Sequence, residues 1–105
     1  MNYSTTREKI IDILRKTDRP LSVDELALIL DVKLTAKEIY EHLHHIAKTI
    51  RSRSRGCEVL AMEPPHCRKC GYVFKDLDKP RKPSRCPRCR SELISPPRFI
   101  ILRKN

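Results

Sequence analysis

The chain has few of the residues that build large hydrophobic cores and no segment suited to crossing a membrane. Its 105 residues include no tryptophan, no glutamine, two glycines and 5% aromatic residues. We therefore expect one small core, assisted by a metal or by disulfides. No apolar run reaches the roughly 18 residues of a membrane span, and the N-terminus lacks an apolar signal-peptide core. These absences predict neither membrane insertion nor export. The lack of glutamine beside abundant Lys, Arg and Glu fits a thermophile.

Positive charge is concentrated in the second half of the chain. The net charge is +10, yet residues 1–50 hold eight basic and eight acidic residues, while residues 51–105 hold fifteen and five. Four thiolates around one divalent metal would remove about two positive charges and leave this half strongly basic. We therefore expect a polyanionic partner, with double-stranded DNA as the leading candidate. The alternative is a charge-rich surface that only keeps the protein in solution.

Three capping boxes predict three helices in the first half. Each has the pattern S/T-x-x-E, in which the hydroxyl and the glutamate satisfy backbone N–H groups at the helix start. The boxes begin at Thr5, Ser22 and Thr35, and they predict helices near residues 6–16, 23–30 and 36–50. The third helix carries apolar residues at the spacing of one buried stripe: Ile39, Leu43, Ile46, Ala47 and Ile50.

The second and third predicted helices, joined by about four residues, have the pattern of a helix-turn-helix whose second member would be the recognition helix. Its outward face is nearly neutral, because Lys37 and Lys48 stand against Glu38 and Glu41. Phosphates do not favour such a face, so we expect DNA binding to depend mainly on arginines after this helix and on the cysteine-rich segment. The predicted contacts are Lys37, His45, Lys48, Arg51, Arg53, Arg55, Arg68, Lys69, Arg81, Lys82 and Arg88. We interpret His42, His44 and His45 as solvated or core-edge residues, because no second ligand cluster matches them.

Two C-x2-C pairs predict a metal site. Cys67 and Cys70 are separated by fifteen residues from Cys86 and Cys89, a spacing typical of tetrahedral zinc. Gly71 follows the first pair and permits a left-handed turn, whereas Arg90 stands at the matching place in the second pair and makes that turn less favourable. The alternative is two thioredoxin-like redox pairs or free thiols. Iron is a less favoured metal.

The fifth cysteine, Cys57, is expected to be a buried strand thiol. The lack of an export signal predicts a cytoplasmic protein, and reduced thiols follow from that setting.

Two apolar runs, residues 57–62 and 98–102, have strand composition and are separated by thirty-five residues. Pro-Pro pairs at 64–65 and 96–97 bracket the segment between them. We predict that the runs pair with each other as the base of a wing. The expected fold is mainly α with small β, a winged helix-turn-helix of residues 1–62 plus 98–105 with a zinc ribbon, residues 63–97, inserted in the wing.

The helical segment SVDELALILDVKLTAKEIYEHLHHIAK and the knuckles CRKCGYVF and CPRCRSEL carry a resemblance over essentially the whole chain. The chain resembles the archaeal predicted transcriptional regulators in which a winged helix-turn-helix is joined to a rubredoxin-like zinc ribbon. This resemblance implies a rubredoxin-like metal geometry for Cys67, Cys70, Cys86 and Cys89. The chain departs from rubredoxin at Arg90, and its linker lacks the rubredoxin aromatic core.

The leading hypothesis is a DNA-binding transcriptional regulator without catalytic activity. A protein-interaction adaptor, docking on transcription machinery through the ribbon or the third helix, is the second, and an iron-binding electron carrier is the third. A hydrolytic zinc enzyme is disfavoured, because four thiolates leave no position for water. A homodimer is expected of a helix-turn-helix protein that reads half-sites, although no coiled-coil pattern supports it.

Overall fold

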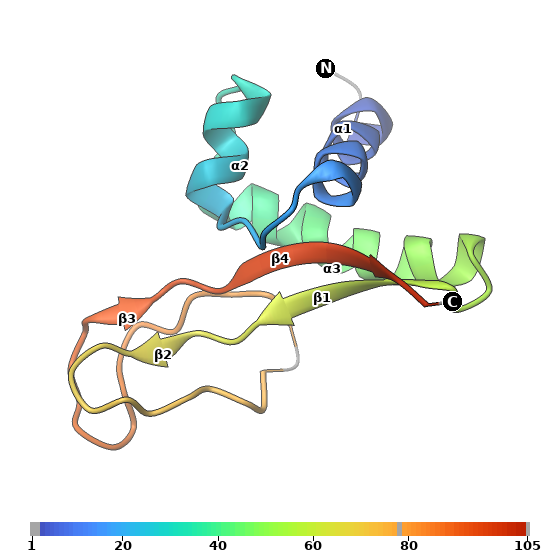
Figure 1. The fold of residues 1–105 in the computed structure, drawn as a ribbon. Helices are drawn as coiled ribbons and strands as arrows, with labels where there is room; N and C mark the ends of the chain where they lie inside the picture. Colours follow the sequence, from blue (N-terminus) through green and yellow to red (C-terminus); the bar gives the residue numbers. More distant parts are fainter. Residues whose placement is uncertain (1–2, 78, 105) are drawn as a thin grey trace.

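Three helices pack together, two of them against a two-stranded sheet, and a cysteine-rich lobe extends from one end of that sheet (Figure 1). This computed structural model describes residues 3–77 and 79–104. In chain order the elements are α1 (Tyr3–Lys16), α2 (Val23–Leu30), α3 (Ala36–Arg53), β1 (Glu58–Glu63), β2 (His66–Cys67), β3 (Ile94–Ser95) and β4 (Arg98–Arg103). Within the described residues, no helix is both long and apolar enough to cross a membrane.

The starts of α2 and α3 confirm two of the three predicted capping boxes. The Ser22 hydroxyl accepts a hydrogen bond from the Glu25 backbone N–H at 3.2 Å, and the Glu25 carboxylate accepts one from the Ser22 N–H at 3.1 Å. Thr35 and Glu38 make the same reciprocal pair at 3.1 and 3.0 Å. Both helices therefore begin where the sequence predicts, because local hydrogen bonds set their starts.

The predicted start of the first helix is wrong. α1 begins at Tyr3, so Thr5 lies within the helix and does not cap it. The S/T-x-x-E pattern caps a helix only where the backbone before it leaves the helical conformation, and here helical structure continues upstream.

α3 also runs three residues beyond its predicted end, to Arg53. Its last turn is closed by hydrogen bonds from the Gly56 N–H to the Arg51 carbonyl at 2.9 Å and from the Arg55 N–H to the Ser52 carbonyl at 3.3 Å. This is a Schellman motif, with Arg55 in the left-handed conformation at φ 53°. Arg51 and Arg53 therefore belong to the helix.

β1 and β4 pair antiparallel, with Glu58 opposite Arg103 and Glu63 opposite Arg98. This confirms the predicted pairing of the two apolar runs. α3 packs on β1 and α1 packs on β4. The chain just before α2 adds an unpredicted bridge, in which Leu21 and Phe99 exchange two backbone hydrogen bonds of 2.8 Å.

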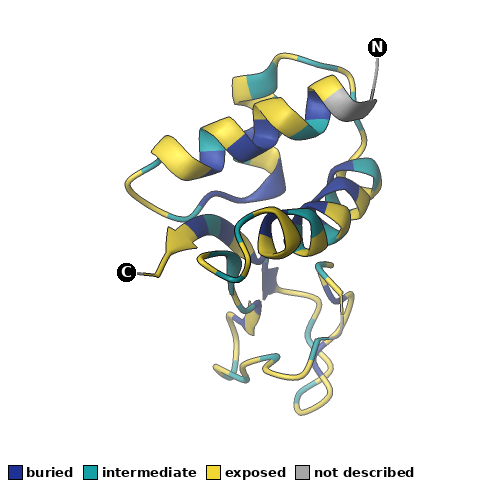
Figure 2. Cartoon of the chain, turned by 90° about the vertical axis from the view of Figure 1, so that its right-hand side faces the viewer, coloured by how far each residue is buried: buried dark blue, intermediate teal, exposed yellow. Residues whose placement is uncertain are grey.

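The hydrophobic core lies between the three helices and the β1–β4 sheet, where the buried segments of Figure 2 gather. Twelve buried apolar side chains form it. The predicted stripe of α3 is buried except at Ala47, which is half-buried. The core residues are Ile10, Ile11, Leu14, Leu21, Val23, Leu26, Ile39, Leu43, Ile46, Ile50, Phe99 and Ile101.

Cys57 differs from its predicted exposure, whereas His42 agrees with its interpretation as a core-edge residue. Cys57 is exposed, because β1 begins one residue later and Cys57 lies in the turn before it. The prediction of a buried strand thiol is therefore wrong. His42 is 4% exposed, and its Nδ1 accepts a hydrogen bond from Arg7 Nε at 3.0 Å. Burial, followed by the charge of Arg7, lowers the pKa of His42.

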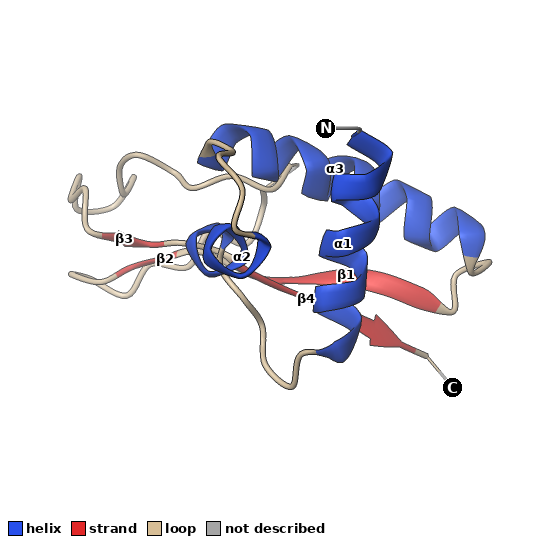
Figure 3. Cartoon of the chain, turned by 90° about the horizontal axis from the view of Figure 1, so that it is seen from above, coloured by secondary structure: helices blue, strands red, loops and turns tan. Residues whose placement is uncertain are grey.

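The segment between β1 and β4 forms the cysteine-rich lobe, which we call the ribbon (residues 66–95). Its only regular pairing among the described residues outside β1 and β4 is the short ladder of β2 with β3. Seen from above, β2 and β3 continue away from the helices in the direction in which β1 and β4 leave them (Figure 3). The molecule is thus a small α/β fold in which three helices and a ribbon share one strand pair.

Candidate metal centre and basic cleft

Four cysteines from two distant parts of the ribbon meet at one point. All four Sγ atoms lie within 4.8 Å of one another. The Sγ atoms of Cys67 and Cys89 are 3.5 Å apart, and those of Cys70 and Cys86 are 3.6 Å apart. A tetrahedral site with metal–sulfur bonds of about 2.3 Å requires sulfur–sulfur distances of about 3.8 Å. The predicted ligand set therefore fits one tetrahedral metal ion.

The two C-x2-C turns have matching backbone geometry. The Gly71 N–H bonds to the Cys67 carbonyl at 2.9 Å, and the Arg90 N–H bonds to the Cys86 carbonyl at 2.8 Å. Gly71 and Arg90 both have positive φ, 82° and 61°. Arg90 thus adopts the same left-handed backbone conformation as Gly71. This conformation strains the backbone of an arginine, a free-energy cost that glycine would avoid.

Backbone N–H groups favour thiolates at this cluster. The N–H of Cys70 lies 3.5 Å from Cys67 Sγ and is the main cause that lowers the pKa of Cys67 to about 6. Burial works against ionisation of Cys86, yet the N–H groups of Cys89 and Arg88 lower the pKa of Cys86. Cys89 differs: the Ser91 N–H works against the shift, yet burial and the neighbouring cysteines raise the pKa of Cys89 to about 11. Because thiolate is the form that binds metal, the backbone of the two turns favours Cys67 and Cys86 as ligands.

Few apolar side chains pack around the cysteine cluster. Cys67, Cys86 and Ile94 are the buried residues of the ribbon cluster, and Tyr72 and Phe74 pack against it half-buried. The Arg88 guanidinium lies 5.4 Å from the Tyr72 ring centre, a cation–π distance. The exposed Arg68 and Lys69 also border the first pair.

The predicted nucleic-acid contacts fall into three groups that do not form one continuous face. Lys37, His45, Arg81 and Lys82 line one cleft, with Lys48 near it. Arg51, Arg53 and Arg55 lie at the C-terminal end of α3, and Arg68, Lys69 and Arg88 lie on the metal-binding turns. The last two groups lie toward opposite ends of the molecule (Figures 1 and 3).

One arginine of the second group is engaged within the protein. Arg53 forms an ion pair of 2.6 Å with Glu8, which joins the end of α3 to α1. Arg51 and Arg55 are exposed and take part in none of the ion pairs among residues 3–77 and 79–104. The phosphate attraction predicted for this group therefore depends on Arg51 and Arg55.

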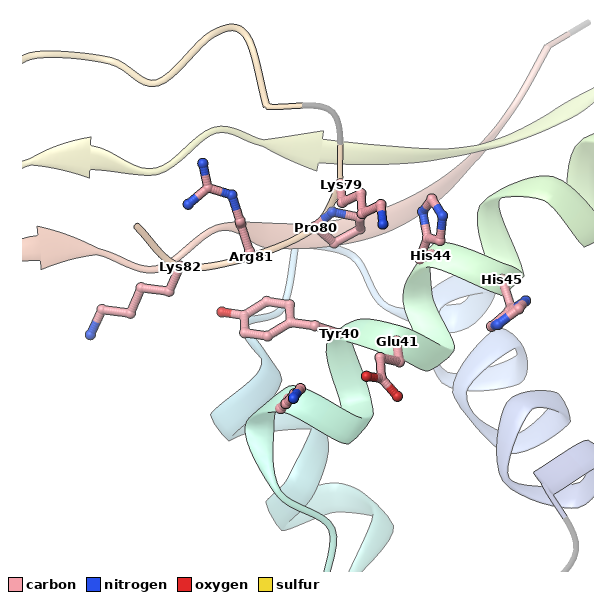
Figure 4. Close-up of a pocket in the computed structure, with 9 residues that line it drawn as sticks. Tyr40, Glu41, His44, His45, Lys79, Pro80, Arg81 and Lys82 are labelled. Atoms are coloured by element: carbon pink, nitrogen blue, oxygen red, sulfur yellow. The ribbon is translucent and has the colours of Figure 1, made fainter. Parts of the chain in front are cut away.

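The cleft lies between the outward face of α3 and the ribbon segment 79–82, and it measures about 480 Å³ (Figure 4). Five of its lining residues are not among the predicted contacts: Tyr40, Glu41, His44, Lys79 and Pro80. No local sequence pattern predicts these residues, because the cleft exists only where a ribbon segment folds back over a helix some forty residues earlier.

Tyr40 holds a fixed position in this cleft. Its ring meets Phe99 edge-on with 6.3 Å between ring centres, and burial is the main cause that raises its pKa to about 12. In Figure 4 the ring extends from α3 beneath Arg81, with its hydroxyl on the side of Lys82. His44, farther along α3, has a lowered pKa, through desolvation and then the charges of Lys48 and Lys79.

The fold and the four-cysteine cluster define a small α/β protein with three helices and a zinc ribbon domain suited to a structural metal site. A family model described as PF0610-like, N-terminal, matches residues 5–60, and one described as the PF0610 rubredoxin-like zinc beta-ribbon domain matches residues 64–104. The chain therefore belongs to the PF0610-like family.

A solved structure agrees with this assignment. The chain is 43% identical in sequence to protein PF0610 from Pyrococcus furiosus, whose solution NMR structure matches it with a TM-score of 0.76. The match covers 99% of this chain and 94% of that one. No curated protein matches the chain.

Proposed function

We propose that the protein is a DNA-binding transcriptional regulator, a winged helix-turn-helix whose wing strands β1 and β4 carry the zinc ribbon. The domain boundaries of this proposal are residues 1–62 plus 98–105 for the winged helix and 63–97 for the ribbon. The observation that carries it is the unit of α2, a short turn and α3, followed by the antiparallel β1–β4 pair. The Leu21–Phe99 bridge, which ties the chain before α2 to this pair, supports the same architecture.

The ribbon metal in this proposal is Zn²⁺, held by Cys67, Cys70, Cys86 and Cys89 as a structural ion. Four thiolates complete a tetrahedral sphere, so the proposal includes no catalytic activity. Metal analysis of purified protein should find one zinc per chain and no visible absorption. Visible colour from ferric thiolate would instead support the iron-binding electron carrier.

DNA affinity in this proposal comes from basic residues more than from base reading by α3. Residues 1–50 carry no net charge, and Glu41 shares the outward face of α3 with Lys37. Each neutralised phosphate contributes about 0.9 to the slope of log affinity against log salt. Replacing Arg51 with Ala and Arg55 with Gly should therefore weaken binding to all duplexes and reduce that slope by up to about 1.8.

The matched control is Lys9→Ala with Lys16→Ala, which removes the same charge from α1. Fluorescence anisotropy over a salt series should show that the control keeps the wild-type slope. Lys37→Ala or His45→Ala should mainly change sequence preference if α3 enters the major groove. An unchanged slope in the folded Arg51 and Arg55 variant would contradict the electrostatic proposal.

A protein-docking adaptor is the second candidate. It is favoured by exposed apolar side chains on the ribbon, Val73 at 38% and Leu93 at 63%, and separately by the near-neutral outward face of α3. Failure of the wild-type protein to bind any duplex at low salt would favour this candidate. Replacing Leu93 with Ser should then abolish copurification with a transcription protein while the metal content stays unchanged.

A further inference from the structure

The cleft between α3 and residues 79–82 has a strongly one-sided charge. Four cationic side chains line it, and Glu41 is the one carboxylate among its described lining residues. None of the four cations enters an ion pair among residues 3–77 and 79–104. The cations are Lys37, Lys79, Arg81 and Lys82. A concave surface of this charge attracts anions and concentrates them.

The size and lining of the cleft indicate more than a lone anion. Its volume of about 480 Å³ lies in the range of small-molecule sites, roughly 300–1,000 Å³, and a single phosphate would leave most of it empty. The Tyr40 ring and Pro80 add apolar surface beside the cations. Tyr40 is held by its edge contact with Phe99, so it presents that surface without first being ordered.

We propose that this cleft binds a nucleoside phosphate, with Arg81, Lys82 and Lys37 contacting the phosphates and Tyr40 contacting the base. Phosphate groups match the guanidinium fork of Arg81 and the point charges of the lysines. A planar base packs on an aromatic ring, a contact that is available to every base because each has a π-face. The ligand thus bridges α3 and the ribbon. Ligand binding itself does not depend on the proposed DNA-binding function.

A calorimetric titration of the metal-loaded, full-length protein tests this site, with ATP, tripolyphosphate and adenosine as probes. ATP should bind more tightly than either tripolyphosphate or adenosine, because only ATP engages both the cations and Tyr40. Arg81→Ala with Lys82→Ala should weaken ATP binding by at least about tenfold, since a hydrogen bond to a charged group contributes about 1.5–3 kcal/mol. Lys9→Ala with Lys16→Ala, on α1, is the control of equal charge and should leave the affinity unchanged.

Tyr40→Leu separates the two halves of the ligand. It should weaken ATP binding while tripolyphosphate binding stays unchanged, and the metal content and helical circular dichroism report whether the variant is folded. Lys37→Ala, at an exposed position, gives a second test of the phosphate contact without touching the core. Equal affinity for ATP and tripolyphosphate in both wild type and Tyr40→Leu would overturn the base contact.

NMR titration of His44 gives an independent readout. Lys48, Lys79 and His45 surround this imidazole with positive charge, and Glu41 shares the cleft. Bound phosphates favour the imidazolium, so ATP should raise the pKa of His44. No binding at millimolar ATP, or equal loss of affinity in the α1 control, would overturn the proposal. Both results would leave the DNA-binding proposal standing, because that is measured on duplexes through Arg51 and Arg55.

Discussion

The helical part of the molecule and the ribbon are held together by different interactions. The helical part, with β1 and β4, buries twelve apolar side chains in one cluster, whereas the ribbon cluster buries two cysteines and Ile94. The ribbon, residues 66–95, therefore has few apolar contacts of its own, and we expect metal binding to contribute much of its folding free energy.

The comparison teaches that one chain uses two stabilising strategies and joins them through a single strand pair. β1 leads into the ribbon and β4 leads out of it, yet both strands pack on the helices. Each part should therefore respond to its own perturbation. The variants below test this separation.

Loss of a metal ligand should have the largest effect, and it should be confined to the ribbon. Cys67→Ser removes a fully buried ligand, and the binding free energy of structural zinc in small domains is about 10–16 kcal/mol. We expect metal loss and collapse of the NMR dispersion of residues 66–95, while the helical signals persist. Cys57→Ser, at the exposed cysteine, is the matched control and should keep one metal per chain.

Complete removal of the ribbon sharpens the same prediction. Glu63 and Arg98 face each other across the strand pair, so Asn-Gly can replace residues 64–97 as a two-residue hairpin turn. The shortened chain should fold cooperatively without metal. Unfolding of its helices would show that the ribbon is part of one common core.

A cavity in the helical core should have the next largest effect. It should destabilise the helical part and leave the ribbon intact. Phe99 is fully buried between Tyr40 and the Leu21 bridge. Phe99→Ala should lower the free energy of unfolding of the helical part by about 3–5 kcal/mol, measured by denaturant titration. The metal should remain bound to the ribbon until a chelator is added. Simultaneous loss of metal and helix in this variant would contradict separate stabilisation.

The sequence predicts best what local interactions decide. The Ser22 and Thr35 boxes place two helix starts, and the spacing of the cysteine pairs identifies all four sulfurs that meet in the structure. Strand composition also identifies the β1–β4 pair. In each case the determining residues are close in sequence or share a chemical constraint.

The remaining features depend on contacts between distant segments. Thr5 matches the capping pattern but lies inside α1, and Cys57 is apolar but lies one residue outside β1. The basic cleft forms only because ribbon residues 79–82 lie next to Tyr40. No periodicity in the sequence predicts that contact. His42 is buried and accepts a hydrogen bond from Arg7 on another helix, thirty-five residues earlier.

Acid should destabilise the helical part through His42, a smaller effect. The lowered pKa of this histidine means that, below about pH 6.5, the unfolded chain binds a proton that the folded chain resists. Stability should therefore fall as the pH drops below that value, and it should be fully present above it. His42→Gln should flatten this dependence in denaturant titrations. Thiolate protonation in the ribbon is common to both proteins, so it cancels in their difference.

Replacing each of the two arginines that have a left-handed backbone conformation with glycine should have the smallest effect. Each replacement should affect only the part of the molecule in which it lies. Arg55 ends α3 at φ 53°, and Arg90 closes the second metal-binding turn at φ 61°. Because L-residues other than glycine are strained there, Arg55→Gly should stabilise the helical part by about 0.5–1 kcal/mol in denaturant titrations, and Arg90→Gly should slow metal loss to a chelator.

Alanine at the same two positions separates backbone strain from charge, because it removes the charge but keeps the Cβ. Stabilisation by Arg55→Ala as large as that by Arg55→Gly would show that charge repulsion, and not the left-handed backbone, is the cause. The DNA-binding proposal adds an opposing expectation for the same variant, since Arg55→Gly should raise stability while it lowers affinity for duplexes. An arginine kept where glycine is more stable would then be explained by its contact with phosphate. A gain in stability with unchanged affinity would leave Arg55 without that role.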